Sequence, residues 1–141
     1  GQYIHQQGPA PQQLAADGVG HVLAQLGPTI GACGFSSLAA TPAWLATDTA
    51  RAFTRAYIKT RDYMNDASAS EIAKAEKPLF PDIDLEVLTD CIATYQAMGC
   101  WTRHIDITQE GYDAMLDIFE YDGKLPHRYR YHQVCAPPPA I

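Results

Sequence analysis

The sequence predicts one helix-rich α/β domain with a few short strands, spanning residues 1–141. Three helix-like segments follow one another after Thr41, and a short aromatic segment with strand-like alternation, ending at Val134, closes them. Ahead of them lies a stretch of small residues, 31–42, that lets backbone approach backbone or a ligand. The 141 residues are 47% hydrophobic and 18% charged, which is typical of a globular chain that buries a core.

The N-terminal part is predicted to contain one strand, one short helix and one ambiguous segment. Residues 2–6 have the pattern of a strand that ends before Gly8-Pro9, and residues 11–16 fit one or two helical turns. Residues 19–26 are apolar, but a segment this short fits a strand or a helix equally well. Gly27-Pro28 predicts a turn.

Capping residues predict where the later helices begin. Thr41 precedes a proline at the first helical position, and Ser68 with Glu71 fits a capping box. Asp84 and Thr108 stand ahead of apolar residues spaced three and four apart. The predicted ends of the helices are Asn65-Asp66, Pro78, Gly99 and Gly123. Residues 129–134 then predict a closing strand, and three prolines predict an extended tail.

The charge balance argues against nucleic acid as a partner. The net charge is -6, whereas a phosphate backbone requires a basic surface. The basic run 127–132 is interpreted as a solvated strand edge, with a nucleic-acid site as the alternative. Asp106, Glu110 and Asp113 are interpreted as charges that favour a helix N-terminus.

Metal binding is not expected. The four cysteines, Cys33, Cys91, Cys100 and Cys135, form no CxxC motif, so free thiols are predicted. His127 and His132, five residues apart, are predicted to point to opposite faces of the closing strand.

The order of short motifs along nearly the whole chain resembles one group of proteins. The motifs are Asp-Gly-Val-Gly (17–20), Ser-Ser-Leu-Ala-Ala-Thr-Pro (36–42), Phe-Pro-Asp-Ile-Asp (80–84), Tyr-Gln-Ala-Met-Gly-Cys-Trp (95–101) and Ile-Thr-Gln-Glu-Gly-Tyr-Asp (107–113). Together they resemble the periplasmic substrate-binding proteins of ABC importers of the NMT1/THI5-like type. Members of that group bind nitrate, sulfonates, taurine or thiamine precursors.

The resemblance implies the C-terminal portion of a type II periplasmic-binding-protein fold. It implies that the chain holds the end of lobe 2, a hinge crossing at about 28–41, and the C-terminal helices of lobe 1. Proteins of this group are about twice as long, so the expected partners are a missing N-terminal half or a second copy (a homo-oligomer), and an ABC permease. The expected location is periplasmic or membrane-anchored and extracytoplasmic, with the cytoplasm as the alternative. The chain begins with Gly1 instead of Met, which predicts processing or trimming.

Two groups of candidate ligand-binding residues follow from the resemblance. His5, Gln6, Gln7 and Gly8 are expected to line a ligand wall, with an uncharged Gln7 where the group often carries an acid. Phe35, Ser36 and Ser37 follow the crossing and offer hydroxyl and amide groups to an anion. The alternative interpretations are a solvated loop for the first group and a closely packed turn for the second.

The expected function is binding of a small polar ligand, without catalysis and without a cofactor. The ligand classes are a sulfonate, a nitrate-like anion or an aminopyrimidine. The sequence has no Ser/His/Asp order, Walker loop or dinucleotide fingerprint. The alternatives are an enzyme on the same scaffold, either a THI5-like pyrimidine synthase or an aromatic-acid decarboxylase, and a non-catalytic assembly subunit.

Overall fold

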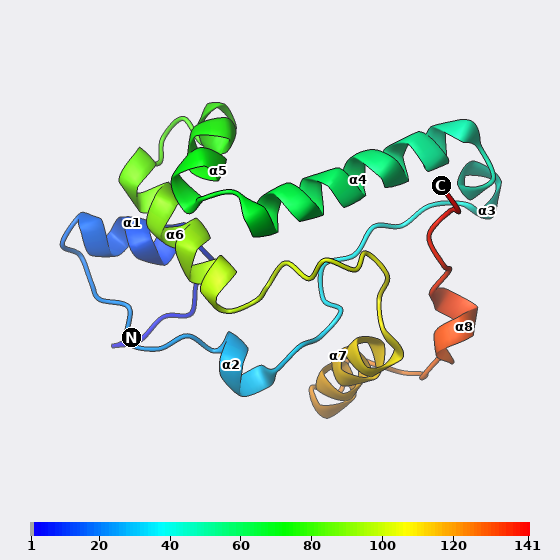
Figure 1. Ribbon diagram of the computed structural model, residues 1–141. Helices are drawn as coiled ribbons and strands as arrows, with labels where there is room; N and C mark the ends of the chain where they lie inside the picture. Colours follow the sequence, from blue (N-terminus) through cyan, green and yellow to red (C-terminus); the bar gives the residue numbers. More distant parts are fainter. Residues whose placement is uncertain (1) are drawn as a thin grey trace. The chain divides into compact units, whose positions relative to one another are not determined.

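A computed structural model describes residues 2–141, and every regular element in that range is helical (Figure 1). The elements, in chain order, are α1 (Ala10–Ala16), α2 (Gly27–Ile30), α3 (Pro42–Leu45), α4 (Asp48–Asp66), α5 (Ala69–Glu76), the 3-10 turn η1 (Lys77–Leu79), α6 (Leu85–Ala97), α7 (Gln109–Tyr121) and α8 (Tyr131–Val134). Since no residue from 2 to 141 lies in a strand, the predicted α/β class and the type II periplasmic-binding fold are wrong for this structure.

The predicted strands fail because a strand needs a neighbour to hydrogen-bond with. Residues 2–6 are irregular and exposed, and no backbone hydrogen bond within the described range pairs them with another segment. Near the C-terminus, Tyr131 O accepts a hydrogen bond from the Cys135 N–H at 2.8 Å, so 131–134 closes into a helical turn. The ambiguous segment 19–26 is neither strand nor helix, and the turn predicted at Gly27 is the start of α2.

The predicted helix starts are confirmed. The Thr41 side chain accepts a hydrogen bond from the Trp44 N–H at 3.2 Å, and the Thr108 side chain accepts one from the Gly111 N–H at 3.1 Å. Ser68 and Glu71 form the predicted capping box ahead of α5. At the far end of α6, Gly99 adopts φ +66, the left-handed conformation that a glycine permits without strain. These helix starts and ends can be predicted from the sequence because each is formed by residues within four positions of one another.

The described chain divides into two compact units. Unit 1 comprises the N-terminal segment up to Leu26 together with Tyr63–Thr102, and unit 2 comprises Gly27–Asp62 and Arg103–Ile141. The chain therefore leaves unit 1 between Leu26 and Gly27, next to the crossing expected at about 28–41. That crossing, and the assignment of 1–141 to one domain, stay predictions.

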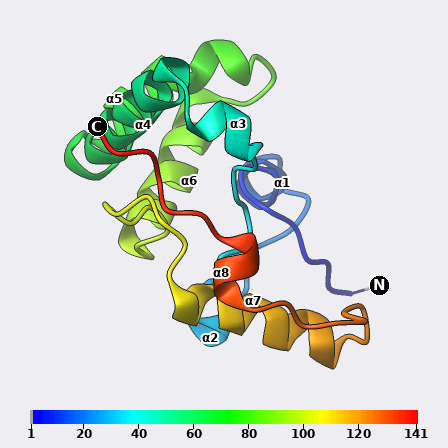
Figure 2. The ribbon, with the colours of Figure 1, turned by 90° about the vertical axis from the view of Figure 1, so that its right-hand side faces the viewer.

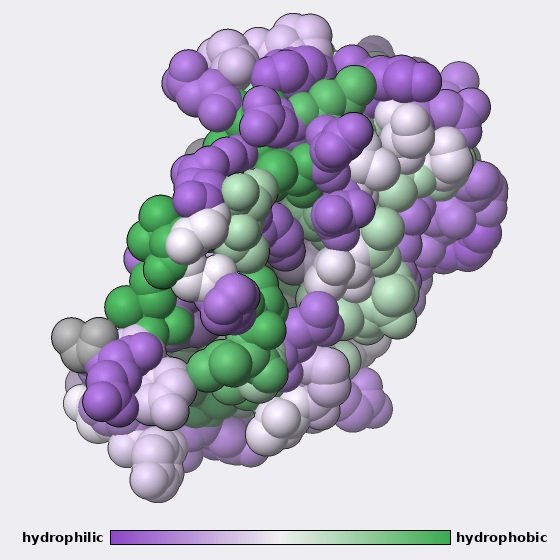
Figure 3. Space-filling view, turned by 90° about the vertical axis from the view of Figure 1, so that its left-hand side faces the viewer, coloured by the Kyte–Doolittle hydropathy of each residue, from purple (hydrophilic) through white to green (hydrophobic). Residues whose placement is uncertain are grey.

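Unit 1 is organised around α5 and α6. Its core is formed by Ile72, Ala73, Leu88 and Ile92, which are at most 3% exposed. The Gln96 side-chain amide donates to Met64 O at 2.9 Å and to Ala67 O at 3.0 Å, which fixes the turn before α5 against α6. Large side chains nevertheless remain at the surface of unit 1, where Tyr3, Ile4, Val19 and Leu23 are each at least 71% exposed. Figure 3 shows hydrophobic residues, in green, at the surface among hydrophilic ones.

Unit 2 is held together by tyrosine hydroxyls around α7. The Tyr112 hydroxyl donates to Tyr129 O at 3.0 Å, and the Tyr131 hydroxyl donates to Ile107 O at 2.6 Å. The two rings meet edge to face with their centroids 5.8 Å apart, so α8 lies against α7 (Figure 2). The segment that leads into α8 is thereby fixed along the helix.

We predict that Ile72→Ala destabilises the protein by about 2–5 kcal/mol, because it leaves a cavity at a side chain that is 1% exposed. Chemical denaturation measures the effect. Ile4→Ala is the matched control within unit 1: Ile4 is 71% exposed, and the same substitution there should change stability by no more than about 0.5 kcal/mol. Equal losses in the two variants would contradict the placement of the core.

Candidate functional site

The first group of predicted ligand-binding residues lies ahead of α1 in unit 1. His5, Gln6 and Gln7 are exposed, and Gly8 is half-buried. The Gly8 N–H donates to the Tyr95 hydroxyl of α6 at 3.1 Å, which fixes the loop to that helix.

Gly8 is required by packing. A Cβ at this position would lie 2.5 Å from Cys91 Sγ and 2.8 Å from the Tyr95 hydroxyl. Burial raises the pKa of the Cys91 thiol, and the negative charge of Glu76 adds to the rise, so the thiol stays protonated near neutral pH. The surroundings of Gly8 are therefore a neutral contact between loop and helix.

The second group belongs to unit 2. Phe35 is 62% exposed, and its ring lies parallel to that of Phe119 with the centroids 6.4 Å apart. The preceding Gly34 N–H donates to Gly111 O at 2.9 Å, while Ser36 and Ser37 are exposed. The two predicted groups therefore belong to different units, and their role in ligand binding stays a prediction.

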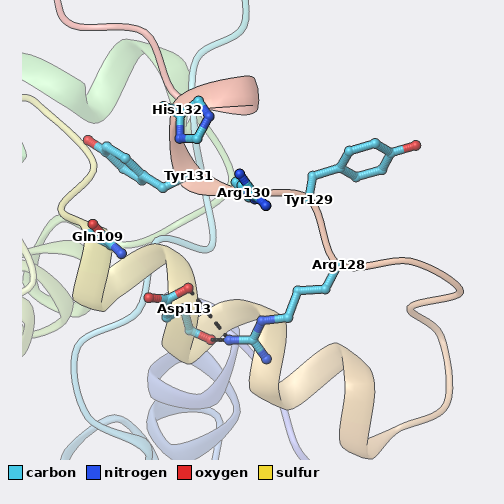
Figure 4. Close-up of a pocket in the computed structure, with 7 residues that line it drawn as sticks. All are labelled: Gln109, Asp113, Arg128, Tyr129, Arg130, Tyr131 and His132. Atoms are coloured by element: carbon cyan, nitrogen blue, oxygen red, sulfur yellow. Dashed lines mark hydrogen bonds and ion pairs between the residues drawn. The ribbon is translucent and has the colours of Figure 1, made fainter.

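A pocket of about 530 Å³ lies beside α7, wholly within unit 2 (Figure 4). It is lined by Gln109, Asp113, Arg128, Tyr129, Arg130, Tyr131 and His132. Gln109 and Asp113 come from the first two turns of α7. Residues 128–130 come from the segment that leads into α8, and Tyr131 and His132 are the first two residues of α8. A volume of this size falls within the usual range of small-molecule sites.

Arg128 is neutralised by carboxylates of α7. Its guanidinium lies 2.5 Å from Asp117, 3.0 Å from Glu120 and 3.5 Å from Asp113. The hydrogen bond to Asp117 raises the pKa of Arg128 above its usual value, with Glu120 and Asp113 contributing in the same direction. Arg128 therefore holds the segment between α7 and α8 against α7.

Arg130 has a different environment. Its side chain is exposed, and no carboxylate among residues 2–141 lies within ion-pair distance of it. In Figure 4 the dashed lines run from Arg128 to Asp113, and none joins Arg130 to another residue drawn. The exposed side chains of Gln109 and His132 line the same pocket and add polar groups.

Sequence reasoning missed this pocket because it placed the basic run 127–132 on a strand edge. The interpretation that His127 and His132 face opposite sides of a strand fails with that strand. Asp113, interpreted as a charge near the helix N-terminus, also pairs with Arg128. A usable signal was present: Asp113, Asp117 and Glu120 are spaced four and three apart, which places them on one face of a helix.

No cluster of three or more His, Cys, Asp or Glu side chains among residues 2–141 is arranged to hold a metal ion. No helix in the same range combines the length and the apolarity needed to cross a bilayer.

Comparison with known proteins finds a relative that is named as a binding protein. The chain is 26% identical over 136 residues to the "Putative binding protein YtlA" of Bacillus subtilis (strain 168), and the match covers 95% of this chain. It covers 41% of the relative, so the chain spans about two fifths of that protein's length. No protein-family model matches the chain, and no solved structure matches it. The narrower resemblance to the NMT1/THI5-like group stays a prediction.

We predict that Gly8→Ala lowers stability by about 1–3 kcal/mol, because the added methyl group overlaps Cys91 and Tyr95. Gly20→Ala is the matched control: a Cβ there meets nothing within 4 Å, and the φ of Gly20 is not positive, so stability should change by less than about 0.5 kcal/mol. Thermal and urea unfolding measure both variants. A Gly8→Ala protein as stable as the Gly20→Ala protein would contradict the close packing of Gly8 on α6.

Proposed function

We propose that this chain is part of a solute-binding protein that delivers a small polar ligand to an ABC-type importer. The observation that carries the proposal is the similarity to a relative named as a binding protein, which extends over 95% of this chain. The pocket beside α7 supports it, since polar side chains converge there on a space of about 530 Å³. The ligand classes are a sulfonate, a nitrate-like anion or an aminopyrimidine.

A complete solute-binding protein requires more polypeptide than this chain provides. The match covers 41% of the relative. The proposed partner is therefore a polypeptide that corresponds to the rest of such a protein, or a second copy of this chain. An importer also requires a permease, and its binding protein works outside the cytoplasm. The segment of about 28–41, which follows the passage out of unit 1, is the proposed hinge.

Thermal shift with a ligand panel tests the function. The panel is methanesulfonate, nitrate, 4-aminopyrimidine and benzoate, each at millimolar concentration. We expect at least one of them to raise the melting temperature, because a ligand at a hundred times its Kd adds about 2.7 kcal/mol to stability.

The other outcomes separate the alternatives. A panel without any shift would contradict the proposal. Consumption of benzoate with release of carbon dioxide would replace the binding role with that of a decarboxylase.

A further inference from the structure

The pocket beside α7 contains two arginines that differ in what surrounds them. Arg128 faces three carboxylates, those of Asp113, Asp117 and Glu120. Arg130 stands two residues further along and faces none of them within ion-pair distance. The guanidinium of Arg128 therefore holds its segment against α7, whereas the guanidinium of Arg130 is available to a ligand.

We infer that this pocket binds a small organic oxyanion, a carboxylate or a sulfonate, and that Arg130 is the residue that recognises its charge. The inference rests on the proposed function and narrows the ligand class. A guanidinium presents a planar fork of donors that matches two oxygens of a carboxylate or sulfonate. The volume of about 530 Å³ exceeds the needs of a bare inorganic ion, so the oxyanion is expected to carry an organic group.

The backbone around Arg130 is fixed on both sides. Tyr129 O accepts from the Tyr112 hydroxyl at 3.0 Å, and the Tyr131 hydroxyl donates to Ile107 O at 2.6 Å. The Arg130 N–H itself donates to the Gln133 side chain at 2.9 Å. Since these bonds hold the segment in place before a ligand arrives, binding costs little ordering of the backbone.

The charge balance of the lining favours an anion over a cation. Asp113 is the one carboxylate among the lining residues, and it already lies 3.5 Å from the guanidinium of Arg128. Gln109 and His132 complete the polar lining and can donate hydrogen bonds to further ligand oxygens. An ammonium ligand would find no unpaired carboxylate there, whereas an oxyanion finds Arg130.

A pair of ligands and a pair of variants test the inference. Methanesulfonate and its neutral analogue methanesulfonamide are titrated into the protein by isothermal calorimetry. We expect methanesulfonate to bind at least tenfold more tightly than methanesulfonamide. Arg130→Gln should weaken methanesulfonate binding at least tenfold, and Arg130→Lys should keep part of it, because a lysine keeps the charge but lacks the fork.

Arg55→Gln is the matched control. Arg55 is exposed, belongs to the same unit and lies outside the pocket, so its loss removes the same charge without touching the site. Methanesulfonate binding to this variant should stay within twofold of the unmodified protein. Circular dichroism confirms that each variant is folded.

The failure of this inference can be told apart from that of the proposed function. If Arg130→Gln and Arg55→Gln bind methanesulfonate as well as the unmodified protein, the site is elsewhere and the inference is wrong. If 4-aminopyrimidine binds and no oxyanion does, the inference is wrong and the binding function stands. If nothing in the panel binds, both fail.

Discussion

The pairing of Arg128 with Asp113, Asp117 and Glu120 is the interaction on which the candidate site depends. It holds the segment after α7 along the acidic face of that helix. The pairs are exposed, so their contribution to the free energy of unfolding is modest and screened by salt. Their importance is geometric. They hold Arg128 against α7, and Arg130, two residues later, lines the pocket without a carboxylate partner among the described residues.

Two different kinds of force act in the two units. Unit 1 is held by apolar burial between α5 and α6, where Ile72, Leu88 and Ile92 are nearly inaccessible to water. Unit 2 buries fewer large side chains and relies on specific bonds, such as that from the Tyr112 hydroxyl to Tyr129 O. Directional bonds fix polar groups in place, which is what a ligand site requires. This contrast is consistent with a division of labour in which the α5–α6 core provides stability and α7 with its neighbouring segment provides recognition.

How far the sequence predicts this structure depends on the range of the interactions. The helix starts at Thr41, Ser68 and Thr108 were predicted because a cap involves residues within four positions. The strands at 2–6 and 129–134 were predicted from alternation alone, and alternation does not supply a pairing partner. The pocket was missed for the same reason, since Arg128 meets Asp113 fifteen positions earlier in the chain, beyond any local pattern.

The most direct test of this account is an NMR titration of the isotopically labelled chain with methanesulfonate, following each backbone amide. The account predicts that the largest shift changes fall on Gln109, Arg130 and His132, around the pocket beside α7. Largest changes at His5–Gly8 or Phe35–Ser37 would place the ligand on the residues expected from the sequence instead, and would contradict the assignment of the pocket.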